Sequence, residues 1–269
     1  MLLRDVDALT ADHRAGANGS DSGDPPDAPD SGGDADAAGD GARDASLDGG
    51  GELPCSPHAG PVGVRVGAYC IDATEVTVKH YRAFLAAKAG DTSGQIAACA
   101  WNASYQPLDA PLGTAFDDYP IVKVDYCDAV AYCRWAGKHL CGKQSGAPLA
   151  TTEATNAARS EWFRTCSGNA DGTHQYPYGQ TYGPATCNGI DHDAGVLPVG
   201  ALPGCVGAYP GVHDLSGNVR EWEDACDDGA TPTASGRCPR TERARVVKRR
   251  GTRSARRTGR ALGVWNDPC

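Results

Sequence analysis

The sequence lacks three features that would assign it to common classes of protein. Its 269 residues contain no apolar run of about 18 residues, so no membrane-spanning helix is predicted. None of the 12 cysteines forms a C-x-x-C pair, which argues against zinc ribbons and thioredoxin-like redox sites, since both use that spacing to bring two sulfur atoms together. Aromatic residues make up only 7% of the chain. We therefore expect a hydrophobic core over part of the length only.

The cysteines are the main indication of the cellular compartment. Twelve cysteines spread along the chain without metal-binding spacing favour a disulfide-stabilised domain in an oxidising compartment. The alternative is a set of buried thiols in a reducing compartment. The sequence does not fix the connectivity, although Cys187–Cys205 and Cys226–Cys238 would each close a short loop. We expect an extracytoplasmic protein, periplasmic or at the cell surface.

Charge divides the chain into three segments. Residues 1–52 carry 13 Asp+Glu and 3 Lys+Arg, whereas residues 237–269 carry 11 Lys+Arg and 2 Asp+Glu. The first segment is rich in Asp, Gly, Ala and Pro and has few side chains to bury, so it is predicted to be a disordered tether. The opening MLLRDVDALT lacks the apolar stretch of a signal peptide. A tether of this kind commonly follows an exported or lipid-anchored start, so we expect a membrane tether if the true N-terminus lies upstream.

The arginine-rich segment 237–269 allows three interpretations. A basic tail can bind nucleic acid or an anionic surface, but this one has no interleaved aromatic residues and no fold signature. We therefore expect no nucleic-acid partner, and nucleic-acid or anionic-surface binding stays an alternative function. The tail is otherwise a disordered segment or the product of a reading-frame change near Cys238.

Residues 53–236 show the patterns of a globular α+β domain with much irregular chain. Thr77 and Asp125 are suitable N-cap residues for two helices that end at Gly90 and Gly137. A third helix is predicted from Thr151 or Thr152 to Gly168. Short apolar runs predict brief strands. These strands are Val62–Val66, Tyr69–Ile71, Ile121–Val124 and Val196–Val199.

Several motifs occur in a characteristic order. They are IDATEVTVKHYRAFL (71–85), YPIVKVDYCDAVAYCRWAGKHLC (119–141), SEWFRTCSG (160–168), PVG (198–200) and GVHDLSGNVREWEDAC (211–226). In this order they resemble the formylglycine-generating enzyme family, also called the sulfatase-modifying factor domain, over roughly residues 60–226. The resemblance implies a compact, irregular α+β fold, related to C-type lectin domains, with low regular secondary structure.

The resemblance also implies structural calcium around DLSGNVREW (214–222). Calcium takes about six to eight oxygen ligands from carboxylates and carbonyl groups, and a tight turn between two acids can supply them. By position, Asp214 and Glu221 would give side-chain oxygens, and Gly217 and Val219 would give backbone carbonyls. Asn218 is expected to brace the turn and Trp222 to pack in the core. The simpler alternative is an ordinary turn with solvated charges.

A second calcium site is implied at CNGIDHDAG (187–195). Asn188 would offer its amide oxygen and Gly189 its carbonyl. Asp191 or Asp193 would add a carboxylate, and the spacing does not decide which.

The catalytic cysteines of the family are not found in this sequence. The family's enzymes oxidise a cysteine of a sulfatase to formylglycine with oxygen and copper, which is bound by two cysteines after an R-G-G-S strand. RRGTRSARR (249–257) is the nearest match and contains no cysteine, and only Cys269 follows Cys238. We therefore assign no catalytic residue and expect no copper.

The resulting expectation is a sulfatase-modifying-factor domain without formylglycine-generating activity. It would act as a calcium-stabilised extracytoplasmic recognition module for an unknown protein, peptide or glycan. The alternative from the family is an active oxidoreductase that generates formylglycine from cysteine in sulfatases.

Overall fold

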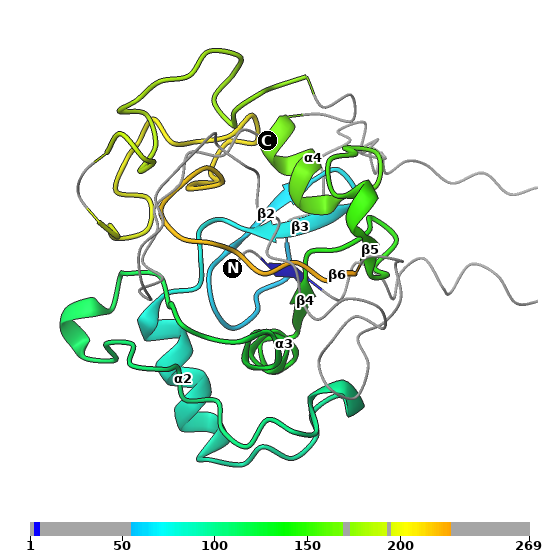
Figure 1. The fold of residues 1–269 in the computed structure, drawn as a ribbon, viewed down its shortest axis with the longest axis vertical. Helices are drawn as coiled ribbons and strands as arrows, with labels where there is room; N and C mark the ends of the chain where they lie inside the picture. The colour runs from blue at the N-terminus through cyan, green and yellow to red at the C-terminus, as the bar shows by residue number, and fades with distance from the viewer. Residues whose placement is uncertain (1–2, 6–54, 169–172, 193–194, 227–269) are drawn as a thin grey trace, which may run out of the picture.

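Two small sheets form the framework of the fold (Figure 1). The computed structural model describes residues 3–5, 55–168, 173–192 and 195–226. The larger sheet is antiparallel, with the order β2-β3-β1-β4. The smaller sheet pairs β5 with β6 in parallel. The strand bounds are β1 Leu3–Asp5, β2 Gly63–Val66, β3 Tyr69–Asp72, β4 Lys138–Leu140, β5 Leu149–Ala150 and β6 Ala225–Cys226.

Local signals in the sequence correctly locate two helices. Helix α2 (Val78–Lys88) begins at Thr77, whose side chain accepts a hydrogen bond from the His80 backbone N–H. Helix α3 (Tyr126–Trp135) begins at Asp125, which accepts from the Asp128 backbone N–H in the same way. These caps satisfy N–H groups that have no partner inside the helix.

The third predicted helix is wrong as a single element. Residues Thr151–Glu153 form one 3₁₀ turn (η3), and helix α4 starts only at Glu161 and runs to Ser167. Ser160 caps α4, and the Glu161 N–H bonds to the carbonyl of Gly142. The contact between Glu161 and Gly142, together with the cap at Ser160, makes the helix begin at Glu161 rather than at Thr151 or Thr152. The predicted end at Gly168 is confirmed, with φ of 84°.

Two of the four predicted strands are confirmed, and the other two are wrong. Val62–Val66 and Tyr69–Ile71 correspond to β2 and β3. Residues 121–124 and 196–199 are irregular chain, although Ile121 N–H bonds to the Val76 carbonyl and Val199 N–H to the Asp118 carbonyl. Pro120 and Pro198 lack an N–H group, and this limits how far pairing can extend.

Strand β1 comes from a part of the chain where no strand is predicted. It lies between β3 and β4 and pairs with both. Three residues are too few for a period-2 pattern to be visible. The other residues of the predicted tether 1–52, and the whole of the predicted tail 237–269, lie outside the described residues.

Two hydrophobic clusters flank the larger sheet (Figure 1). In the first, α2 packs on α3, and Phe84 lies within 5.7 Å, between ring centroids, of Tyr81, Tyr105, Tyr132 and Trp135. In the second, α4 contributes Phe163 and the sheet contributes Tyr69 and Ile71. The sheet is thus covered by helices on both sides.

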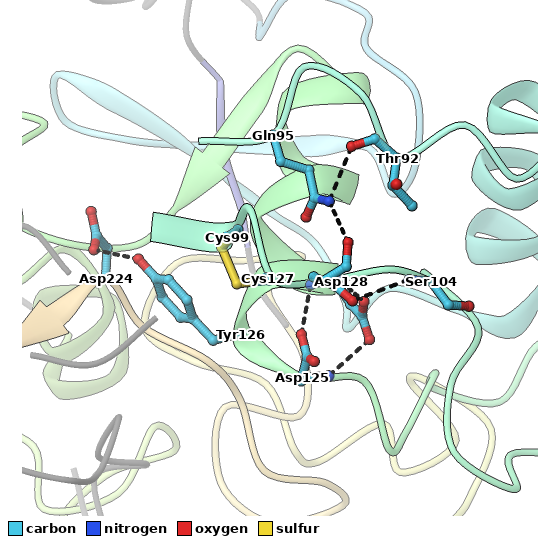
Figure 2. The surroundings of a disulfide bond; sticks show 10 residues. Thr92, Gln95, Cys99, Ser104, Asp125, Tyr126, Cys127, Asp128 and Asp224 are labelled. Atoms are coloured by element: carbon cyan, nitrogen blue, oxygen red, sulfur yellow. Dashed lines mark hydrogen bonds between the residues drawn. A yellow bond between two sulfur atoms is a disulfide. The ribbon is translucent and has the colours of Figure 1, made fainter. Parts of the chain in front are cut away.

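Disulfides hold the irregular segments to this framework. Cys99–Cys127 joins the 3₁₀ turn η1 (Ala97–Cys99) to the first turn of α3 (Figure 2). Cys55–Cys70 joins the start of the domain to β3, and the predicted Cys187–Cys205 pair is confirmed. Cys226 is also disulfide-bonded, but Cys238 lies outside the described residues, so the predicted Cys226–Cys238 pairing stays a prediction.

In the described part of the chain, no helix is both long and apolar enough to cross a bilayer.

Phe84→Ala tests the aromatic cluster between α2 and α3. Phe84 is fully buried, so its removal should lower the free energy of unfolding by about 3–5 kcal/mol through lost packing and a residual cavity. Phe116→Ala is the matched control, because Phe116 is 39% exposed and should cost about 1 kcal/mol or less. Urea denaturation of the full chain measures both. Equal losses of unfolding free energy in Phe84→Ala and Phe116→Ala would contradict the aromatic core described here.

Candidate functional site

The turn DLSGNVREW places Asp214 inside the protein. Asp214 is buried, adopts a left-handed backbone conformation with φ of 59°, and its Oδ2 accepts a 2.6 Å hydrogen bond from the Gly200 N–H. Gly217 has φ of 94°, and a Cβ atom there would lie 2.4 Å from the carbonyl oxygen of Asn188. Only glycine allows this close approach of two backbone segments.

Asn218 connects the turn to two other segments. Its Oδ1 accepts from Asn188 Nδ2 (2.9 Å) and from the Leu197 N–H (3.0 Å), and its Nδ2 donates to the Leu197 carbonyl. Its own N–H bonds to the Asn188 carbonyl at 2.8 Å. Asn218 therefore braces the turn, as expected.

One buried oxygen of Asn188 has no hydrogen-bond partner. The side chain is 2% exposed, and its Nδ2 donates to Asn218 Oδ1 and to the Gly195 carbonyl. Its Oδ1 is buried without a donor. A buried amide oxygen without a partner costs free energy, and a cation would remove that cost.

Glu75 presents the same situation with a carboxylate. It is 1% exposed, and its carboxyl group lies within hydrogen-bonding reach of the Asp214 and Asn218 side chains, although neither of its oxygens makes a hydrogen bond of good geometry. Burial raises the pKa of Glu75 well above its ordinary value, and the neighbouring charge of Asp214 raises it further. Burial likewise raises the pKa of Asp214, with the charge of Glu221 adding to the effect. Three acids thus influence one another electrostatically around the turn.

The second half of the turn is tied to α4 and to the first core cluster. Glu221 is half-buried, and its Oε2 accepts a 2.6 Å hydrogen bond from Trp162 Nε1. Trp222 is half-buried, packs edge-on against Tyr126 at the side of the first core cluster and donates to the Val124 carbonyl. Val219 is half-buried and Arg220 is exposed.

The second predicted calcium site is only partly described. Asn188 and Gly189 are buried side by side, and the Gly189 N–H bonds to the Cys187 carbonyl. Asp191 is exposed and accepts a hydrogen bond from the Tyr182 hydroxyl. Asp193 lies outside the described residues, so the choice between the two aspartates stays open.

These donors suit a hard cation better than a transition metal. Within the described ranges, no three His, Cys, Asp or Glu side chains cluster tightly enough to hold a metal by themselves. A site here would have to include amide and backbone carbonyl oxygens, which are ligands that calcium accepts. The unpartnered oxygens of Asn188 and Glu75 fit that requirement.

The described thiols do not suit copper. Cys133 and Cys141 are both buried, and burial raises the pKa of each thiol well above its ordinary value. Protonated, buried thiols are poor Cu(I) ligands, because the thiolate is the ligand form. Cys238 and Cys269 lie outside the described residues.

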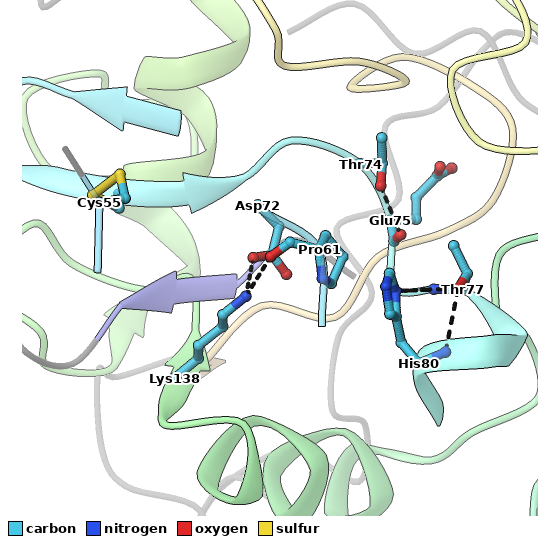
Figure 3. A network of polar contacts seen from close by, with 9 residues as sticks. Cys55, Pro61, Asp72, Thr74, Glu75, Thr77, His80 and Lys138 are labelled. Carbon is cyan, nitrogen blue, oxygen red and sulfur yellow. Dashed lines mark hydrogen bonds and ion pairs between the residues drawn. A yellow bond between two sulfur atoms is a disulfide. The ribbon is translucent and has the colours of Figure 1, made fainter. Parts of the chain in front are cut away.

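Three buried charged residues were not predicted from the sequence to belong to a site. They are Glu75, Asp72 and Lys138. Glu75 lies in the motif IDATEVTVKHYRAFL (71–85), two positions before the helix cap Thr77, and no local pattern there indicates a buried acid. Asp72 and Lys138 form a buried ion pair at 2.5 Å, and Lys138 Nζ also donates to the Pro61 carbonyl at 2.8 Å (Figure 3). The partners are 66 residues apart, so no local pattern could have paired them.

Asn218→Ala tests the connection between the three segments. It removes the three side-chain hydrogen bonds to Asn188 and Leu197 and leaves buried polar groups unpaired, so we expect a loss of about 2–4 kcal/mol of unfolding free energy. Asn156→Ala is the control, since it removes one exposed hydrogen bond to the Ala158 N–H and should cost below about 1 kcal/mol. Chemical denaturation compares the two. A loss at Asn218 no larger than at Asn156 would show that this residue does not hold the segments together.

Parts of this chain are similar to known proteins. The formylglycine-generating enzyme of Bos taurus is 32% identical over 152 residues, which are 49% of this chain and 36% of that protein. The enzyme of the same name from Thermomonospora curvata is 33% identical over 105 residues, covering 39% of this chain and 33% of the relative. The inactive C-alpha-formylglycine-generating enzyme 2 of Bos taurus is 32% identical over 116 residues, covering 39% and 32%.

The matched part of the chain thus spans only about a third of the length of these relatives. The family model of the sulfatase-modifying factor enzyme 1-like domain matches residues 37–259, which is most of the chain. The motif order, the mixed fold with little regular structure and this match lead to one conclusion: the chain belongs to the sulfatase-modifying factor family, whose curated members include formylglycine-generating enzymes.

Proposed function

We propose that the protein is an extracytoplasmic, calcium-stabilised recognition module of this family without formylglycine-generating activity. The observation that carries the proposal is the state of the cysteines. Eight described cysteines are in disulfides, and the two others are fully buried thiols. Disulfides persist in oxidising compartments, which supports an extracytoplasmic location.

The unpartnered oxygens support the calcium part of the proposal. Asp214 is held in place by the Gly200 N–H and by the left-handed conformation of its backbone. Asn188 brings a buried oxygen without a hydrogen-bond donor to the turn, and Glu75 brings a buried carboxyl group close to Asp214 and Asn218.

At the first site, calcium would be held by the side chains of Asp214 and Glu221 and by the carbonyls of Gly217 and Val219. At the second site, it would be held by the side chain of Asn188, the carbonyl of Gly189 and the carboxylate of Asp191 or Asp193. Calcium at the first site would neutralise acids that burial alone disfavours.

The absence of activity is proposed from chemistry. Oxidation of a substrate cysteine through Cu(I) needs accessible thiolates, and neither Cys133 nor Cys141 meets that requirement. A family member named as inactive is among the relatives, which shows that such proteins exist in this family.

An active formylglycine-generating enzyme is the second candidate. The bovine and Thermomonospora relatives are formylglycine-generating enzymes, and this favours the second candidate. It would require a thiolate pair formed with the participation of Cys238 or Cys269, and it predicts tight Cu(I) binding.

Calcium should raise the thermal stability of the full chain. A ligand that binds only the folded state adds about 2.7 kcal/mol at a free concentration one hundred times its Kd. We expect the unfolding midpoint to rise with Ca²⁺ and to return on chelation, and Asp214→Asn should weaken the apparent Ca²⁺ affinity about tenfold or more by removing a charged ligand.

Asp91→Asn is the matched control for this measurement. Asp91 is exposed and bonds only locally to Ser93, so its replacement should leave the calcium response unchanged. If wild type shows no shift with Ca²⁺, or if both variants respond alike, the calcium part of the proposal is wrong. The use of Mg²⁺ in parallel separates a specific site from general screening of charge.

A Cu(I) competition assay separates the two candidate functions. We expect the oxidised full chain to retain no Cu(I) in the presence of a chromogenic Cu(I) chelator. We also expect it to leave the cysteine of a sulfatase-derived peptide unchanged, as measured by mass spectrometry. Stoichiometric Cu(I) retention together with aldehyde formation would establish the enzyme instead.

A further inference from the structure

Strand β1 fills the place between β3 and β4 in the larger sheet, and we call this place the slot (Figure 1). On one side of the slot, Arg4 is paired with Ile71 of β3. On the other side, Leu3–Asp5 are paired with Lys138–Leu140 of β4. Among the described strands, β4 has no other neighbour, so β1 alone pairs it with the rest of the sheet.

The two walls of the slot are strand edges that face each other. All four residues of β3 are buried, and so are Lys138 and Leu140 of β4. Buried N–H and C=O groups are paired in nearly all native structures, because an unpaired group costs free energy. If β1 left the slot, the groups that face it would lose their partners within the sheet, and both edges would be templates for another strand.

A side-chain contact joins the two walls without any contribution from β1. Asp72 at the end of β3 and Lys138 at the start of β4 form the buried ion pair described above, although β1 lies between their strands. Lys138 Nζ also donates to the carbonyl of Pro61. Since residues of the walls themselves form this contact, the spacing of the walls does not depend on which chain supplies the inserted strand.

A long stretch of sequence separates the inserted strand from the domain that it completes. Residues 6–54, which number 49, connect Asp5 to Cys55. An extended residue spans about 3.3–3.6 Å, so a connection of this length can reach the slot of a neighbouring copy. Leu3–Asp5 would make the same backbone pairings in either slot, and the concentration of competing strands decides between the two.

We propose that the slot also accepts Leu3–Asp5 of a second copy of this chain, and that two copies exchange these strands reciprocally to form a dimer. Exchange of an identical element is a low-cost route to a dimer, because each contact within a chain is replaced by the same contact between chains. The inference goes beyond the recognition role proposed above and does not rest on it. The calcium and copper experiments involve other residues, so the two proposals can fail separately.

Light scattering after size-exclusion chromatography of the full chain tests the exchange. We expect a monomer at micromolar concentration and a dimer fraction that rises with concentration, to one tenth or more after incubation at about 1 mM, which is the order of effective concentration for tethered segments. A chain that stays monomeric at this concentration would overturn the proposal. So would a dimer that persists in non-reducing SDS gel electrophoresis, because an intermolecular disulfide would then hold it.

Arg4→Pro should reduce the dimer fraction at least tenfold. Arg4 is paired with both walls of the slot, and proline has no backbone N–H to donate to a neighbouring strand. Arg4→Ala is the matched control, because it keeps the N–H and should leave the dimer fraction within about twofold. A dimer that Arg4→Pro retains, or an equal loss in both variants, would contradict exchange through the backbone of β1.

A peptide measurement tests the slot without a dimer. A fluorescent peptide MLLRDVD (1–7) is added to a chain that lacks residues 1–5, and its anisotropy is measured. We expect saturable binding, at least tenfold weaker for the peptide with Arg4→Pro and for the full chain, whose slot is filled. No saturable binding, or equal binding by the full chain, would overturn the proposal. Binding of the peptide combined with a full chain that stays monomeric would also overturn it, and would indicate a strand from another protein.

Discussion

Buried oxygen atoms that lack hydrogen-bond partners impose the main energetic constraint on this domain. Glu75 and Asn188 approach the DLSGNVREW turn from different segments, and Asn218 links that turn to Asn188 and Leu197. Desolvated carboxylates without a compensating charge are costly, and their mutual repulsion adds to the cost. A cation bound at the DLSGNVREW turn would attract the carboxylates of the turn, and this attraction would offset their desolvation and their mutual repulsion. Because the loops around it are irregular, such a cation would organise much more of the chain than its own ligands.

Irregular chain of this kind needs support that regular secondary structure does not supply. Among the described residues, two small sheets and three short helices fix only part of the backbone. Disulfides attach the segments around residues 55, 99 and 187 to neighbouring parts of the fold. The same oxidised state leaves only buried thiols among the described cysteines that are not in disulfides. Among the described cysteines, the disulfides that stabilise the fold therefore leave no exposed thiol for a metal.

The sequence predicted what depends on neighbouring residues. Thr77 and Asp125 cap helices as expected, because a capping side chain acts on N–H groups two or three positions away. The third helix was predicted too long because the contact between Glu161 and Gly142 is tertiary and leaves no local pattern. For the same reason the Asp72–Lys138 pair and the unpartnered oxygens of Glu75 became visible only in three dimensions. The turn residues Gly217 and Asn218 were identified because the motif DLSGNVREW resembles the corresponding turn of the family, which is a contiguous stretch of sequence.

Hydrogen exchange measured by mass spectrometry, with and without Ca²⁺, tests the central claim most directly. If calcium compensates the buried oxygens, amide exchange in residues 187–200 and 212–222 should slow markedly on addition of Ca²⁺, while α2 and α3 should change little, because they are held by aromatic packing and by a disulfide. Identical exchange of these two loops in Ca²⁺ and in chelator would contradict the account.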